Sequence, residues 1–200
     1  FTEDDFITNA AGEQELREGI PRQTFTAKVR PGDIKYVDLD QNGVIDTYDQ
    51  MAIGGTENPE IVYGFGVNLR WKDLDFGAMF QGIGRTWRIL SSNIMPASNK
   101  GSLYNIFDNY QDRWTVDNQS QDVFYPRADY GPNANNSQNS TWWLRNMSFL
   151  RLKNVELGYS CPKKWLQGFV ISNARVFVRG TNLLTFSKFD LWDPELATGD

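Results

Sequence analysis

The strongest constraint on this chain is an alternation of apolar and polar residues that recurs in four long segments. In the clearest one, Pro59 to Trp71, every second residue from Ile61 onward is large and apolar, and most residues between are glycine or polar. A period of two residues is typical of a β-strand with one apolar face. Each segment has about ten to fourteen residues, against about five or six in globular proteins and about nine to eleven in strands that cross a bilayer. The length therefore favours membrane-spanning strands.

The other three segments extend this pattern. Leu74 to Trp87 follows a tight turn at residues 72–73 and is expected to form a hairpin with the first segment. Within Phe149 to Tyr159 the apolar residues change parity near Asn154, which predicts a β-bulge. Ala174 to Phe186 alternates in the same way. We therefore expect an all-β fold of antiparallel strands.

The connections between these segments differ greatly in length. The expected parts are a loop region at 1–58, a barrel hairpin at 59–87, a long loop at 88–147, a strand pair at 148–186 and a further loop at 187–200. Short turns at one end of the strands and long loops at the other are typical of outer-membrane barrels. A soluble β-sandwich with one long insertion would alternate in the same way, so this alternative stays open. No stretch approaches the ~18 consecutive apolar residues of a transmembrane helix.

Two short helices are expected outside the strands. Thr2, which is followed by acidic residues, fits the N-terminal cap of a helix that reaches about Ala11. A second, amphipathic helix is indicated by four aromatic residues at helical spacing, Tyr104, Phe107, Tyr110 and Trp114.

The composition excludes many kinds of functional site. The chain has no histidine and a single cysteine, Cys161. This removes Ser-His-Asp and Cys-His nucleophile systems, histidine-ligated zinc, CxxC redox pairs and an internal disulfide. A formal net charge of −5 argues against nucleic acid as a partner. We expect neither catalytic residues nor enzymatic activity.

An aspartate-rich stretch, Asp38 to Asp49, has the spacing of a calcium-binding loop. Such a loop offers side-chain oxygens at positions one, three and five, a glycine at six, a backbone carbonyl at seven and further ligands at nine and twelve. The corresponding residues are Asp38, Asp40, Asn42, Gly43, Val44, Asp46 and Asp49. Position twelve is Asp rather than the longer Glu, and the preceding residues look extended rather than helical. The spacing predicts Ca²⁺ or another hard cation as cofactor; the alternative is a hydrogen-bonded turn with solvated carboxylates.

Six tryptophans are placed where they could meet a ligand or a membrane. Trp114, Trp142 and Trp143 lie in the long loop, where flat amphipathic rings could contact a ligand or partner. The alternative is that they form the core of the loop or part of an interface belt. The other three lie at expected strand ends or turns, as do the interfacial aromatic residues of membrane barrels; they are Trp71, Trp87 and Trp165.

Four motifs, in this order, make the chain resemble a known family. They are PGDIKYVDLDQNGVID, NPEIVYGFGVNLRWKDLDFGAMFQG, WLRNMSFLRLKNVELGYSCP and RVFVRGTNLLTFSKFDLWDPE. Together they cover nearly all of the chain from about Pro31 to Glu195. The chain resembles the C-terminal part of the SusC/RagA family of TonB-dependent outer-membrane transporters of Bacteroidetes.

The resemblance implies a fold and a function. The strands would belong to a transmembrane β-barrel of twenty-two strands around a plug, with long extracellular loops, in contact with outer-membrane lipid. The transporter would import oligosaccharides or oligopeptides together with a SusD-like surface lipoprotein. The TonB complex would energise import by acting on N-terminal parts outside this chain.

The resemblance also implies that the plug and the final strand lie outside these 200 residues. We therefore expect the chain to be a fragment that needs its longer polypeptide or detergent. Six cations would face the barrel lumen, Arg70, Arg85, Arg151, Lys153, Arg175 and Arg179. The alternative is a soluble, secreted β-sandwich that binds carbohydrate and uses calcium structurally, and it predicts a complete fold within these residues.

Overall fold

The computed structural model describes residues 1–90, 108–129, 131, 133–168 and 170–195. The chain divides into two compact units. The loop unit consists of Phe1–Gly54 and Ile89–Leu144, and the strand unit consists of Gly55–Arg88 and Arg145–Asp200. Among the described residues, no helix has the length and apolar character needed to cross a membrane.

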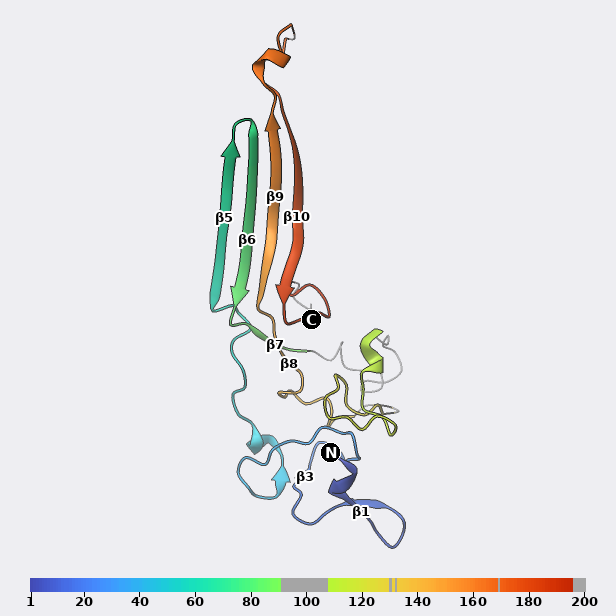
Figure 1. Ribbon diagram of the computed structural model, residues 1–200. Helices are drawn as coiled ribbons and strands as arrows, with labels where there is room; N and C mark the ends of the chain where they lie inside the picture. The colour runs from blue at the N-terminus through green and yellow to red at the C-terminus, as the bar shows by residue number, and fades with distance from the viewer. Residues whose placement is uncertain (91–107, 130, 132, 169, 196–200) are drawn as a thin grey trace. The chain divides into compact units, whose positions relative to one another are not determined.

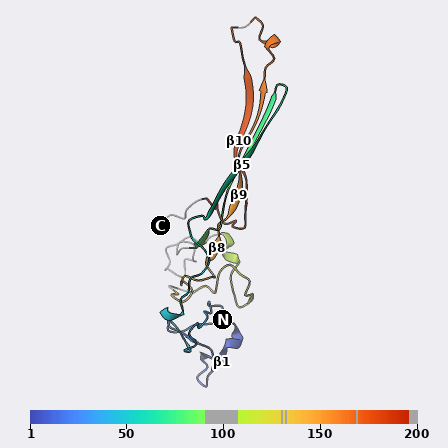
Figure 2. The same ribbon diagram turned by 90° about the vertical axis from the view of Figure 1, so that its left-hand side faces the viewer.

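The strand unit is built on one four-stranded antiparallel sheet (Figure 1). Its strands are β5 (Ile61–Trp71), β6 (Leu74–Gly84), β9 (Phe149–Ser160) and β10 (Arg175–Ser187), in the spatial order β10-β9-β6-β5. Figure 2 shows the sheet nearly edge-on, as a single twisted layer. The expected antiparallel all-β arrangement is therefore confirmed for this unit.

The register of the sheet brings the apolar positions of all four strands onto one face. Phe65 lies opposite Phe80, which lies opposite Leu152, which in turn lies opposite Leu184. The Phe65 and Phe80 rings stack with their centroids 5.0 Å apart. Because side chains alternate along a strand, the polar residues between these positions share the opposite face. We call the two surfaces the apolar face and the polar face.

The β-bulge expected near Asn154 is present. Met79 pairs with Asn154 but the next residue, Phe80, pairs with Leu152, so that Lys153 has no partner on β6. On β10, the register also shifts between Thr181 and Leu184. Lys153 is thus an extra residue in β9. It keeps the apolar side chains on one face although they change from even to odd sequence positions along the strand.

The second hairpin strand is shorter than the sequence predicted, so the expectation of one strand reaching Trp87 is wrong. β6 ends at Gly84, and Arg85 takes a left-handed conformation with a φ of 53°. The chain continues as β7 (Trp87–Ile89), which pairs with β8 (Leu144–Asn146).

The loop unit contains only short elements within the described residues. Its strands β1 (Phe6–Thr8) and β2 (Gln14–Leu16) form one antiparallel pair, and β3 (Arg22–Gln23) and β4 (Val44–Ile45) form a parallel pair. Short 3-10 helices are η1 (Glu3–Asp5), η2 (Thr47–Asp49) and η4 (Asp108–Gln111). A fourth, η5 (Lys163–Trp165), belongs to the strand unit.

The predicted N-terminal helix is wrong beyond its first turn. Thr2 precedes η1, and the Asp5 carboxylate accepts hydrogen bonds from the Thr2 backbone and hydroxyl, but the chain then becomes β1. Phe6 has to be buried in a small core with Phe1 and Val29, and a strand conformation achieves this. Of the predicted amphipathic helix, residues 104–107 lie outside the described part of the chain, and η4 covers only Asp108–Gln111.

Candidate functional site

The apolar face of the sheet is exposed over its whole length. On this face the large side chains of the central strands are partly half-buried, as at Phe76, Phe80 and Leu152. Twelve others have exposed fractions between 38 % and 74 %; they are Ile61, Tyr63, Phe65, Val67, Leu69, Trp71, Leu74, Leu157, Val176, Val178, Leu184 and Phe186. An exposed apolar surface that is continuous over four strands is typical of contact with a membrane or a partner. An eleven-residue strand is about 36 Å long. Tilted by about 40°, it spans about 28 Å, which matches the ~25 Å apolar band of outer-membrane barrels.

Aromatic residues gather on this face at the end of the sheet where residues 72–73 join β5 to β6, which we call the turn end; the opposite end is the loop end. Trp71 ends β5, and Tyr159 lies opposite Leu74 at the start of β6. The Trp165 ring, on η5, lies 6.1 Å from the Tyr159 ring. Trp71 and Trp165 are largely exposed, as expected for interfacial aromatic residues. Trp87 differs, because it is half-buried and packs against Gly55.

The polar face carries paired charges rather than isolated ones. Arg175 of β10 donates to the Glu156 carboxylate at 2.7 Å and also to Asp75 of β6. Arg179 donates to Glu156 at 2.7 Å. The face is therefore hydrophilic and nearly charge-balanced at this end of the sheet. Arg85 lies beyond the end of β6, where it pairs with Glu60 at 3.3 Å.

Arg151 is the one of the six expected lumen cations that the structure buries almost completely, with 2 % of its surface exposed. Its Nε donates to Thr185 Oγ1 at 3.1 Å, and its other two nitrogens reach the Asp193 and Glu195 carboxylates. Lys153 also contacts Glu195, at 3.4 Å. The chain that follows β10 therefore folds back onto the polar face. Hydrogen bonds from the Glu195 backbone and from Arg151 lower the pKa of the Asp193 carboxyl.

The aspartate-rich loop brings three of its predicted ligands together. Oxygen atoms of Asp38, Asp40 and Asp49 lie within 4.8 Å of one another. The loop is closed by backbone donors: the Gly43 nitrogen donates to Asp38 Oδ2 at 2.7 Å, and the Asn42 nitrogen to Asp40 Oδ1 at 3.1 Å. Gly43 has a φ of 83°, the left-handed conformation that the sharp turn requires.

The other predicted ligands are arranged differently. Asp46 is not part of the close group; its Oδ1 accepts a hydrogen bond from the Tyr48 nitrogen and so caps η2. The carbonyls of Gly43 and Ile45 accept hydrogen bonds from β3 and the residue after it. Because carbonyls alternate in direction along a strand, the Val44 carbonyl points away from β3. Backbone hydrogen bonds, the strongest from the Asp46 nitrogen, lower the pKa of the Asp49 carboxyl.

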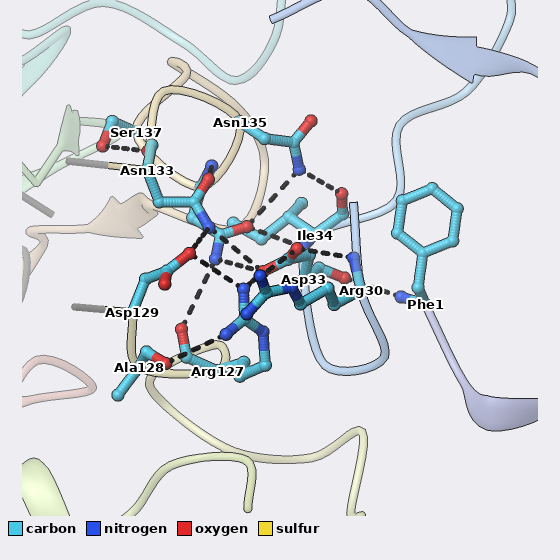
Figure 3. A network of polar contacts seen from close by, with 11 residues as sticks. Phe1, Arg30, Asp33, Ile34, Arg127, Ala128, Asp129, Asn133, Asn135 and Ser137 are labelled. Carbon is cyan, nitrogen blue, oxygen red and sulfur yellow. Dashed lines mark hydrogen bonds and ion pairs between the residues drawn. The ribbon is translucent and has the colours of Figure 1, made fainter. Parts of the chain in front are cut away.

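A buried polar network, which sequence reasoning missed, joins two distant parts of the loop unit (Figure 3). The Asp33 carboxylate is fully buried and accepts hydrogen bonds from the side chains of Asn133 and Asn136 at 3.1 and 2.9 Å. Arg127 lies 3.2 Å from the same carboxylate. Asn135 donates to the Ile34 carbonyl at 2.8 Å. The network fixes the chain immediately before the aspartate-rich loop.

The three loop tryptophans lie mainly inside the loop unit. Trp143 is fully buried and its Nε1 donates to the Asn136 carbonyl at 2.9 Å. Trp114 is also buried and packs on Gly32. Trp142 is half-buried and donates to the Phe124 carbonyl at 3.0 Å. These positions make Trp114 and Trp143 packing residues of the unit, and contact with a ligand or partner stays a prediction for Trp142.

Comparison with known proteins gives the family. No family model matches the chain. It is 34 % identical over 166 residues to TonB-dependent receptor P26 and 31 % identical over 176 residues to TonB-dependent receptor P3, both of Formosa agariphila. These alignments cover 82 % and 86 % of this chain but 16 % of each relative. The chain thus spans about one sixth of the length of the curated relatives it matches.

Solved structures agree in both fold and sequence. The RagAB peptide importer in its "open-open" state matches with a TM-score of 0.60 and 31 % identity, over 80 % of this chain and 18 % of that one. The "closed-closed" state gives a TM-score of 0.59 and 33 % identity, with the same coverage. TonB-dependent receptor SusC of Bacteroides thetaiotaomicron is 24 % identical over 90 % of this chain and 17 % of its own length. The chain belongs to the SusC/RagA family of TonB-dependent outer-membrane transporters.

Proposed function

We propose that this chain forms part of an active importer of oligosaccharides or oligopeptides. The observation that carries the proposal is the two-faced sheet: one face is apolar over membrane-spanning length, and the other carries the charged side chains of the strands, mostly in ion pairs. Such a sheet separates lipid from a hydrated lumen. The relatives named above are receptors and importers, which supports transport rather than catalysis.

The sheet is proposed to continue into a closed barrel. In the described residues, β5 and β10 are the outer strands of the sheet. Unpaired backbone groups at a sheet edge in lipid each cost several kcal/mol, so only closed barrels are stable there. We assign the four strands to a barrel of twenty-two strands around a plug, as the family resemblance implies.

The long connections are proposed to lie outside the cell. The turn at residues 72–73 joins β5 to β6 directly, whereas about sixty residues separate β6 from β9 at the other end. Short periplasmic turns and long extracellular loops are the rule in outer-membrane barrels. The loop unit would then face a SusD-like lipoprotein that covers the barrel, and the TonB complex would supply the energy from the periplasm.

A calcium site in the aspartate-rich loop is a separate proposal. The three converging carboxylates supply oxygen ligands suited to a hard cation, and the Val44 carbonyl is the predicted backbone ligand. The ion would rigidify an extracellular loop rather than take part in transport. Terbium luminescence of the purified, chelator-treated transporter tests the proposal, and a lack of binding at millimolar calcium would reject it.

The soluble β-sandwich alternative has less support. A sandwich needs a second sheet packed on the apolar face. In the described part of the chain this face is exposed instead.

Transport is tested with the full-length protein in its native membrane. We expect the peptides of this chain in a large outer-membrane band that migrates differently before and after boiling. Deleting the gene, or the TonB gene, should abolish uptake of one class of nutrient oligomer from the medium. A soluble species of about 23 kDa, or uptake that persists in both deletions, would contradict the proposal.

A further inference from the structure

A cavity of about 340 Å³ lies at the loop end of the polar face, entirely within the strand unit. Gln81 and Ile83 of β6 and Phe149 of β9 form its floor, and these three residues have polar-face positions in the register. The wall opposite is formed by Pro194 and Glu195, which follow β10. The volume is at the lower end of the ~300–1,000 Å³ of small-molecule sites, so it suits one unit of an oligomer rather than the whole.

The cavity has a fixed frame. Thr86 is buried; its hydroxyl donates to the Glu57 carbonyl at 2.7 Å and its carbonyl accepts from the Met147 nitrogen at 3.0 Å. The Pro194–Glu195 wall is held by the buried Arg151, whose Nη1 lies 2.5 Å from Glu195 Oε2. The Pro194–Glu195 wall is therefore tied to β9 by the Arg151 guanidinium.

The chemistry of the lining favours an aliphatic group. Ile83 is aliphatic and half-buried, Met147 and Pro194 are buried apolar residues of the lining, and the Phe149 ring is buried beneath the Arg151 guanidinium, which lies 5.0 Å from the ring centroid. No open aromatic face is therefore offered to a sugar ring by Phe149. The amide side chains of Asn58 and Gln81 also line the cavity and can pair with the backbone of a peptide.

The charged residues that line the cavity are compatible with a neutral ligand, because their charges are nearly balanced. The Glu195 carboxylate is compensated by Arg151 and Lys153. The remaining charged residues of the lining are one anion, Glu57, and one cation, Arg88.

From these contacts we propose that the cavity is a subsite on the lumen wall for one aliphatic side chain of an imported oligopeptide. Arg151 is its positioning residue, because it holds the Pro194–Glu195 wall without lining the cavity. The inference rests on the proposed transport function and names the substrate class within it.

The test uses the full-length transporter purified in detergent with its surface lipoprotein. Two synthetic octapeptides of glycine and serine serve as probes; one carries a single central leucine and the other a serine at that position. We expect the leucine peptide to bind about tenfold or more tightly, since the subsite removes the leucine side chain from water. Equal binding of the two peptides would overturn the proposal.

Variants then test which residues produce the preference for the leucine peptide. Ile83→Gln should reduce the preference for leucine to below about threefold, and Glu195→Gln, which weakens the Arg151 contact, should reduce it in part. Arg179→Ala, on the same face but outside the cavity, is the matched control and should keep the full preference. Heat-modified gel migration shows that each variant has assembled. An undiminished preference in assembled Ile83→Gln would overturn the subsite.

A neutral oligosaccharide, maltoheptaose, separates this inference from the transport function. If maltoheptaose binds and is imported while neither peptide binds, the peptide subsite is rejected and the importer stands. If the gene deletion leaves uptake of every oligomer unchanged, the transport function itself fails.

Discussion

The Tyr63 ring lies across Gly82, its partner on the neighbouring strand, and its hydroxyl donates to the Phe149 carbonyl on the strand beyond, at 3.1 Å. A Cβ atom placed on Gly82 would lie 2.4 Å from Tyr63 Cζ and 2.5 Å from the Phe149 carbonyl oxygen. Tyr63 thus fills the space of the missing side chain and links three strands at the loop end of the sheet.

Gly82→Ala should therefore destabilise the barrel by about 1–3 kcal/mol, since the methyl group meets backbone and must displace the Tyr63 ring. The measurement is the urea concentration at which the heat-modifiable band is lost. Gly84→Ala is the matched control, because its Cβ would meet Ile61 Cβ at an ordinary 3.6 Å. Equal midpoints for the two variants would show that the close approach at Gly82 has no energetic weight.

Adjacent residues on opposite faces of β6 test which face meets lipid. Ala78 pairs with Val67 and Val155 on the apolar face, whereas Met79 lies on the polar face. Ala78→Arg should cost about 2–4 kcal/mol at the middle of the bilayer and reduce assembly, and Met79→Arg should be tolerated in a hydrated lumen. The amount of heat-modifiable protein in outer membranes is the readout. A larger loss for Met79→Arg would reverse the assignment of the faces.

The buried carboxylate of Asp33 should control the order of the loop unit. Asp33→Ala would leave Arg127 and the Asn133 and Asn136 amides without their shared acceptor, at a cost of about 3–5 kcal/mol. We expect faster hydrogen exchange and proteolytic cleavage at residues 30–36 in the full-length protein, with the barrel unaffected. Asp129→Asn changes a more exposed partner of Arg127 and should have a smaller effect. Unchanged exchange in Asp33→Ala would show that the network is dispensable.

Within the aspartate-rich loop, the predicted ligands should differ in how much each contributes to Ca²⁺ affinity. Asp38→Asn and Asp40→Asn remove charge from the converging group and should weaken Ca²⁺ binding by tenfold or more. Asp46→Asn lies outside that group and should weaken binding less. Calorimetry on the purified transporter gives the ranking. If Asp46→Asn proves the most damaging, the bound loop must rearrange from the conformation described here.

The long strands and their bulge could be predicted from the sequence, because period-two alternation over more than ten residues has few competing explanations. The bulge was predicted directly by the change of parity of the apolar residues near Asn154. The end of β6 was missed, since Arg85 carries no sequence signal for its left-handed conformation. The burial of Arg151 was missed for another reason: its carboxylate partners, Asp193 and Glu195, come about forty residues later in the chain.

The loop unit was the least predictable part. Asn133, Asn135 and Asn136 lie in a run of small polar residues, which normally indicates a solvated loop. They are buried because Asp33 and Ile34, about one hundred residues earlier, supply their hydrogen-bond partners. Local patterns do not contain such pairings. The aspartate-rich loop was more accessible to prediction, since its spacing is contained within twelve residues.

Tyr36 should make the loop unit sensitive to alkaline pH. Burial raises the pKa of its phenol well above the ordinary value of 10, and its hydroxyl donates to the Asn135 carbonyl at 2.6 Å. The unfolded chain therefore loses this proton at a lower pH than the folded chain. The stabilisation is complete below about pH 10 and is lost as the pH rises through the higher, folded pKa.

Tyr36→Phe removes both the hydrogen bond and the titration. At pH 7 the variant should be less stable by about 1 kcal/mol, the usual net value of one hydrogen bond. Above about pH 10 the difference should narrow and then reverse, because the variant has no phenol to ionise. The stability difference between Tyr36→Phe and the native protein is measured at each pH by hydrogen exchange of residues 30–36 in the full-length protein. Tyr48→Phe, at an exposed position, is the control and should leave the stability at pH 7 unchanged. A constant difference between Tyr36→Phe and the native protein at all pH values would mean that Tyr36 does not titrate as described.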